Sequence, residues 1–145
     1  MQIDPRGTRF AAAVTSGVLA LVLITGSPWL LLAQLAVFAV GAFAGPARSP
    51  YGWFFARTVR PRLAPPTELE DARPPQFAQL VGFTFAAVGV AAFALGATAV
   101  AFVAVAAALA AAFLNAAYGY CLGCEMYLIG RRLLNRPVPA GVAAD

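Results

Sequence analysis

The chain has 145 residues, of which 61% are hydrophobic and only 11% are charged, and its mean hydropathy is +0.78. Soluble domains are about half apolar and about a quarter charged. The composition therefore argues against a soluble enzyme, a disordered segment and a disulfide-stapled secreted scaffold, and predicts an integral membrane protein. The net charge of +4 comes from arginines that lie between apolar runs instead of forming a patch, so no nucleic-acid partner is expected. Histidine is absent, which excludes His-dependent catalytic triads and His-rich zinc sites.

Two long uncharged runs determine the number of predicted membrane crossings. Residues 10–47 and 77–124 contain no charged side chain. As single helices these runs would be about 57 and about 72 Å long, whereas the hydrocarbon core of a bilayer is about 30 Å thick. Each run must therefore turn back, and the turns are expected at Gly26-Ser27-Pro28 and around Leu95-Gly96-Ala97-Thr98.

The predicted fold is an all-α membrane bundle of four transmembrane helices in two hairpins, forming one membrane domain over residues 1–145. The predicted spans are approximately residues 9–26, 28–45, 77–95 and 98–119.

Arginine positions predict the orientation. All ten arginines lie before or at the start of the first span, in the loop 46–76 or in the tail 120–145, and none lies in the two turns; they are Arg6, Arg9, Arg48, Arg57, Arg60, Arg62, Arg73, Arg131, Arg132 and Arg136. By the positive-inside rule, both termini and the central loop face the cytoplasm of a bacterial inner membrane.

The central loop contains two kinds of segment. In residues 51–60, aromatic side chains fall on one helical face and arginines on the other, which predicts a short interfacial helix; a simple extension of the second span is the alternative. Residues 61–76 are rich in proline and predict an extended linker. Gly-xxx-Gly spacings at residues 41–45 and 119–123 favour close helix packing within the bundle, with a homodimer as the alternative.

Both cysteines of the chain stand in one C-x-x-C motif, Cys121 and Cys124, followed by Glu125. If the last helix continues through this motif, Tyr118, Cys121, Cys124 and Glu125 share a face at its cytoplasmic end. This spacing favours a redox-active dithiol, with Glu125 as proton acceptor, although an acid and a helix C-terminus both disfavour a thiolate. Half of a shared metal site and simple packing are the alternatives, and a permanent disulfide is not expected in the cytoplasm.

Asn115 and Tyr118 are predicted to shape the pocket beside the cysteines. Asn115 is the strongly polar residue deep in the fourth span, and Gln34 of the second span would be its partner if the two lie at the same depth. No cofactor is predicted, and the motif leaves open whether the protein is an enzyme.

Three segments resemble one known family, the domain of unknown function 4395: the opening residues 1–12, the link Arg48-Ser-Pro-Tyr-Gly and the segment 113–127. The resemblance implies a small multi-pass membrane protein of bacteria such as actinobacteria. It also suggests a thioredoxin-like or rhodanese-like partner, because such proteins are often encoded near family members. The predicted function is therefore thiol–disulfide exchange or sulfur relay at a membrane dithiol. The alternative is a non-catalytic anchor whose cysteines only pack.

Overall fold

The computed structural model describes residues 1–134, and Arg136 and the rest of the predicted tail from residue 135 onward lie outside the described residues. The described chain is helical, as predicted, apart from one pair of two-residue strands. The α-helices are α1 (Pro5–Thr25), α2 (Pro28–Phe43), α3 (Pro50–Phe54), α4 (Arg73–Ala94), α5 (Thr98–Tyr118) and α6 (Leu122–Leu133). Shorter segments are the 3-10 helices η1 (Pro46–Arg48) and η3 (Arg60–Arg62), the π-helical η2 (Phe55–Val59), and the strands β1 (Gln2–Ile3) and β2 (Glu70–Asp71).

Both expected turns are present. Gly26 ends α1 in the left-handed conformation, with φ of 64°, which a glycine adopts without steric cost. The Ser27 side chain then accepts a hydrogen bond of 3.3 Å from the backbone N–H of Leu30, and Pro28 occupies the first turn of α2, where no N–H is needed. The second turn lies between α4 and α5, at residues 95–97.

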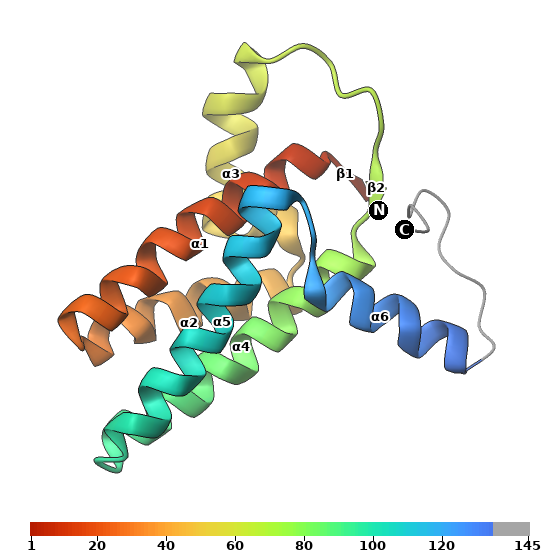
Figure 1. Ribbon diagram of the computed structural model, residues 1–145. Helices are drawn as coiled ribbons and strands as arrows, with labels where there is room; N and C mark the ends of the chain where they lie inside the picture. The colour runs from red at the N-terminus through yellow and green to blue at the C-terminus, as the bar shows by residue number, and fades with distance from the viewer. Residues whose placement is uncertain (135–145) are drawn as a thin grey trace.

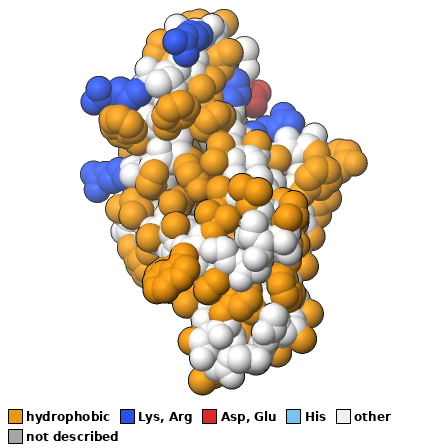
Figure 2. Space-filling model, turned by 90° about the vertical axis from the view of Figure 1, so that its left-hand side faces the viewer, with side chains coloured by type: hydrophobic (Ala, Val, Ile, Leu, Met, Phe, Trp, Pro, Cys, Tyr) orange, Lys and Arg blue, Asp and Glu red, His pale blue; other side chains and the backbone are white. Residues whose placement is uncertain are grey.

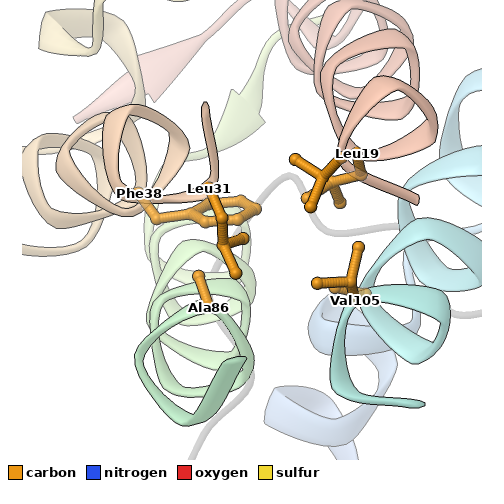
Figure 3. Packing of buried hydrophobic residues seen from close by; sticks show 7 residues of the cluster. Leu19, Leu31, Phe38, Ala86 and Val105 are labelled. Carbon is orange, nitrogen blue, oxygen red and sulfur yellow. The ribbon is translucent and has the colours of Figure 1, made fainter. Parts of the chain in front are cut away.

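The two helical hairpins interlock instead of standing side by side. Helix α1 packs more extensively along α5 than along its hairpin partner α2, and α2 packs along α4 (Figure 1). Large apolar side chains from all four helices meet at the centre, where Leu19, Leu31 and Val105 are at most 1% exposed (Figure 3). The core is therefore shared by both halves of the chain.

Small residues allow the helices to approach closely within this bundle. A Cβ atom added at Gly82 would lie 2.5 Å from the Phe38 ring, and one added at Gly41 would lie 2.7 Å from the Gln79 side chain. These contacts fix α2 against α4. The predicted packing role of Gly41 is thus internal to the chain, while a homodimer stays a prediction.

Three of the helices, α1, α4 and α5, are long and apolar enough to cross a membrane, and α2 is a shorter apolar helix of 16 residues. Charged side chains gather towards one end of the molecule. On the face seen in Figure 2, arginines occupy the upper part, and the lower part is hydrophobic or uncharged. The length, the composition and this distribution of charge are those of a membrane-associated protein.

The two halves of the chain begin in the same way, and their starts are joined. Strands β1 and β2 pair antiparallel, with Gln2 opposite Asp71. Asp4 accepts a hydrogen bond from the backbone N–H of Arg6 and forms an ion pair with its side chain. Asp71 makes the same two contacts with Arg73. Residues 61–76 are therefore not an extended linker throughout: α4 already begins at Arg73, because prolines in its first turn fit a helix start.

The central segment after η1 is helical from Pro50 to Arg62, close to the short helix predicted at 51–60. Its Phe55 side chain is 4% exposed and packs against Phe10 of α1, with 5.7 Å between ring centroids. This contact fixes the segment to the end of the bundle that carries β1 and β2.

Candidate functional site

The last predicted span ends before the cysteine motif. Helix α5 stops at Tyr118, and Gly119 follows in the left-handed conformation with φ of 68°, its N–H donating to the carbonyl of Asn115 at 3.0 Å. The prediction that Tyr118, Cys121 and Cys124 share one face of a continuous helix is therefore wrong. The physical reason is the glycine, since only a residue without a side chain adopts this conformation at little cost.

The motif instead begins a separate helix. Cys121 is the N-cap of α6, and its sulfur accepts a hydrogen bond of 3.3 Å from the backbone N–H of Cys124. The two cysteines form a disulfide, with 5.2 Å between their Cα atoms, a normal separation for such a bond. The two sulfurs are neighbours, as the spacing predicted.

The position of the pair reverses the expected electrostatics. The sequence placed the sulfurs at a helix C-terminus, whose partial negative charge opposes a thiolate. In the structure the sulfurs lie at the N-terminus of α6, where backbone N–H groups and the helix dipole stabilise a negative sulfur. Glu125 lies in the first turn of the same helix, so one carboxylate opposes this effect.

Helix α6 is held against the start of α4. A Cβ atom at Gly123 would lie 2.5 Å from the Cα of Ala78, so the two backbones are in close contact. The ring of Tyr127 packs against Phe77 with 5.8 Å between centroids, and Leu128 is 4% exposed. These contacts position the disulfide over the bundle.

The disulfide lines a pocket of about 480 Å³ between the beginnings of α1, α4 and α6 and the second half of α5. Its charged lining residues are Arg9, Glu70, Asp71 and Glu125. Its apolar lining reaches the core residues Phe38 and Ala108. A pocket of this volume and lining is typical of a small-molecule site.

Four of the five predicted site residues line this pocket, namely Asn115, Cys121, Cys124 and Glu125. Tyr118 is not among its lining residues and is 74% exposed. Both cysteines are half-buried, so burial does not distinguish a more accessible one.

Gln34 does not pair with Asn115. It is 1% exposed, donates to the hydroxyl of Thr15 at 3.4 Å and accepts a hydrogen bond of 2.7 Å from the hydroxyl of Tyr51. Gln34 therefore belongs to a polar cluster of the first half of the chain.

Arg9 and Glu70 are pocket residues that the sequence did not indicate. The Arg9 guanidinium donates to the carbonyl of Ala116 at 3.2 Å, a contact between positions 107 residues apart. Burial, and to a lesser degree the nearby Glu68, raises the pKa of the Glu70 carboxyl above its ordinary value. Both residues reach the pocket through contacts between distant parts of the chain, and such contacts produce no recognisable motif in the local sequence. One local signal links residues 70–73 to the N-terminus: the pattern Asp-x-Arg occurs at Asp4–Arg6 and again at Asp71–Arg73.

Within residues 1–134, no group of three or more His, Cys, Asp or Glu side chains is arranged to hold a metal ion.

A model of the protein family described as Domain of unknown function (DUF4395) matches residues 3–132 of this chain. Comparison of the chain with curated proteins and with solved structures gave no match.

Proposed function

The chain belongs to the DUF4395 family, whose description assigns no activity, and from the geometry of its site we propose a membrane protein that performs thiol–disulfide exchange. The disulfide Cys121–Cys124 at the N-terminus of α6 is the observation that carries this proposal. A disulfide between residues three apart, at a helix start and beside a pocket, is suited to opening and closing repeatedly.

The exchange transfers two electrons and two protons. A dithiol partner attacks the disulfide through one thiolate and forms a mixed disulfide with one sulfur of the pair. The partner's second thiolate then breaks that bond, which leaves the partner oxidised and both Cys121 and Cys124 as thiols. The reverse sequence of steps oxidises the pair.

Cys121 is the proposed attacking residue when the pair is reduced. As the N-cap of α6 it is the sulfur that the N–H of Cys124 contacts, and the helix N-terminus stabilises its thiolate form. Cys124 is then the resolving residue, and Glu125 accepts a proton. Asn115 shapes the pocket, and the exposed Tyr118 offers a contact surface for a soluble thioredoxin-like or rhodanese-like protein.

We propose that α2 crosses the membrane together with α1, α4 and α5, which gives four spans in two hairpins. The turns after α1 and after α4 lie at the same end of the bundle, and α2 returns the chain to the end that carries α3 (Figure 1). Its 16 residues extend about 24 Å, compared with about 32 Å for α1. A bilayer adapts to such a mismatch by local thinning at a small energetic cost.

In the proposed orientation, the end of the bundle that carries α3 and the cysteine pair lies at the cytoplasmic face of the bacterial inner membrane. The arginines support it, because cytoplasmic loops carry the excess of positive residues. Labelling of the reduced cysteines in intact cells with a membrane-impermeant maleimide tests the orientation, since labelling from the periplasm contradicts it.

Trapping of mixed disulfides tests the exchange itself. In Cys124→Ser the attacking Cys121 remains but the resolving thiol is missing, so a partner should stay covalently attached and be released by a reductant. Cys121→Ser should trap less, and the double serine variant should trap nothing.

If neither single variant captures a partner, and the double variant grows normally under thiol stress, the cysteines only pack. The protein then fits the alternative of a membrane anchor.

A further inference from the structure

A membrane dithiol needs a second redox partner if it is to turn over, and the pocket beside Cys121 and Cys124 is suited to one. We propose that this pocket binds a quinone, a lipid-soluble two-electron acceptor, and that the reduced cysteine pair passes its electrons to it. This inference rests on the proposed function, because it requires that the disulfide opens and closes.

The pocket combines the two environments that a quinone headgroup requires. Towards the core its wall is apolar, formed in part by Ala12, Phe38 and Ala108, each at most 8% exposed. Towards the charged end it carries Arg9 and Glu125. A substituted ring with polar carbonyl groups at its edges matches a volume of about 480 Å³ with this distribution of polarity.

The polar wall contains a hydrogen-bond donor without a partner. Within residues 1–134 the side-chain amide of Asn115 makes no hydrogen bond to protein, although the residue is half-buried and lines the pocket. By contrast, the buried amide of Gln34 has two partners. The amide of Asn115 is therefore available to donate to a ligand in the pocket, and a quinone carbonyl oxygen would accept its N–H.

The pocket also extends to the side of the bundle that lipid would cover. Among its lining residues, Phe85 of α4 is 39% exposed and Ala107 of α5 is exposed. Both lie within helices that are long and apolar enough to cross a membrane. A quinone dissolved in the bilayer therefore has an entry that does not require passage through water.

The transfer is balanced. The two S–H bonds of Cys121 and Cys124 break, the S–S bond forms, and two electrons and two protons reduce the quinone to its quinol. Asp71 is paired with Arg73, so Glu125 and Glu70 are the remaining carboxyl groups of the lining, and they can carry a proton between the sulfurs and the quinone oxygens.

The test uses the full-length protein purified in detergent, reduced, and mixed without oxygen with decylubiquinone. Quinone absorbance reports its reduction, and the mass shift after thiol alkylation reports oxidation of the cysteines. A parallel sample receives oxidised glutathione, which reacts with exchange-competent thiols without needing the pocket. The double variant with serine at both cysteine positions gives the background.

Two variants test the site. Ala111→Phe fills the pocket from its α5 wall, while Ala110→Phe places the same ring on an exposed position of α5 outside the lining and serves as the matched control. Asn115→Leu removes the free amide. We expect Ala111→Phe and Asn115→Leu each to slow quinone reduction about tenfold, as loss of access or of one hydrogen bond does, while Ala110→Phe slows neither quinone reduction nor the reaction with glutathione.

The outcomes separate the two proposals. If the wild type reacts with glutathione but reduces quinone no faster than the double serine variant, the quinone site is wrong and thiol exchange stands. If it reacts with neither, both are wrong. If quinone reduction is equally fast in Ala110→Phe, Ala111→Phe and Asn115→Leu, the reaction occurs outside this pocket and the inference fails.

Discussion

The segments that follow the two hairpins have the same local design and different chemistry. After α2, a glycine with positive φ leads to Ser49, whose hydroxyl caps α3 by accepting the N–H of Gly52 at 3.2 Å. After α5, a glycine with positive φ leads to Cys121, whose sulfur caps α6 by accepting the N–H of Cys124. The same kind of cap is thus a serine hydroxyl in one half and one sulfur of a disulfide in the other.

The first half could not hold a second cysteine in the same position. A Cβ atom at Gly52 would overlap the carbonyl oxygen of Pro46, because the chain folds back tightly through η1. After α5 the connection is more open, and a side chain is accommodated at the equivalent position, Cys124. The comparison shows that the cysteine pair is placed on a helix cap of a kind that the first half of the chain also has.

The largest effect is expected when the capping cysteine of α6, Cys121, is replaced by serine, the residue that caps α3. In Cys121→Ser, an oxygen replaces the sulfur, so the disulfide with Cys124 cannot form and the two-electron exchange cycle should be abolished. With both proteins reduced, the free energy of unfolding should change by less than about 1 kcal/mol, because serine is a good N-cap. Alkylation kinetics and chemical denaturation measure the two effects. A large loss of stability would show that the sulfur has a structural role that the hydroxyl of Ser49 does not have.

The next largest effect is expected where α6 contacts α4. Gly123→Val inserts a branched side chain where the Cα of Ala78 already lies 2.5 Å from a Cβ position. We expect α6 to separate from α4 at a cost of about 1–3 kcal/mol, detected as faster proteolysis and amide exchange of residues 122–133.

Gly130→Ala is the matched control in the same helix, since nothing lies within 4 Å of its added Cβ. It should leave α6 in place or stabilise it slightly, because alanine favours a helix more than glycine does. Equal proteolysis of the two variants would contradict the close contact between α6 and α4.

The polar residues of the two halves should also respond differently. Gln34→Leu leaves the hydroxyls of Tyr51 and Thr15 without their shared partner, and should lower the free energy of unfolding by about 1–3 kcal/mol. Asn115→Leu removes no hydrogen bond to protein and should have little effect on stability. Thermal unfolding in the same detergent compares them, and a larger loss for Asn115→Leu would contradict the assignment of its amide to a ligand.

The smallest effect is expected at the paired starts of the two halves. Hydrogen bonds from Arg6 and Arg73 hold the pKa values of Asp4 and Asp71 below their ordinary value of 3.8. Lowered carboxyl pKa values stabilise the folded state above pH 3.8, and this stability is lost as the pH falls through the lower folded-state values.

The unfolding temperature of Asp71→Asn should therefore decrease less than that of the wild type as the pH is lowered. Measuring the unfolding temperature of both proteins against pH tests this. The effect is expected to be small because Arg73 is 55% exposed and water weakens its ion pair with Asp71. A steeper loss of stability in Asp71→Asn than in the wild type would contradict this assignment.

Much of the fold was predictable because membrane thickness is a strong constraint. The uncharged runs around Gly26 and Gly96 were too long for single crossings, and both turns were located from composition alone. The length of α2 was not predictable in the same way. Its end at Phe43 depends on the turn that η1 makes, which a hydropathy pattern does not encode.

The candidate site was only partly predictable. The spacing of Cys121 and Cys124 indicated neighbouring sulfurs, and the structure agrees. Extending the helical period through Gly119 assigned them to the wrong helix end, although a glycine followed by a capping residue is a recognisable helix boundary. Arg9 and Glu70 could not be assigned to the pocket, because they reach it through contacts distant in sequence.

The interlocked arrangement of the hairpins has a consequence during synthesis. Because α1 and α2 find their main partners in α5 and α4, the first hairpin is synthesised before the surfaces that complete it exist. We expect a nascent chain that is stalled after residue 72 to be a preferred substrate for membrane quality-control proteases, and the finished chain to escape them.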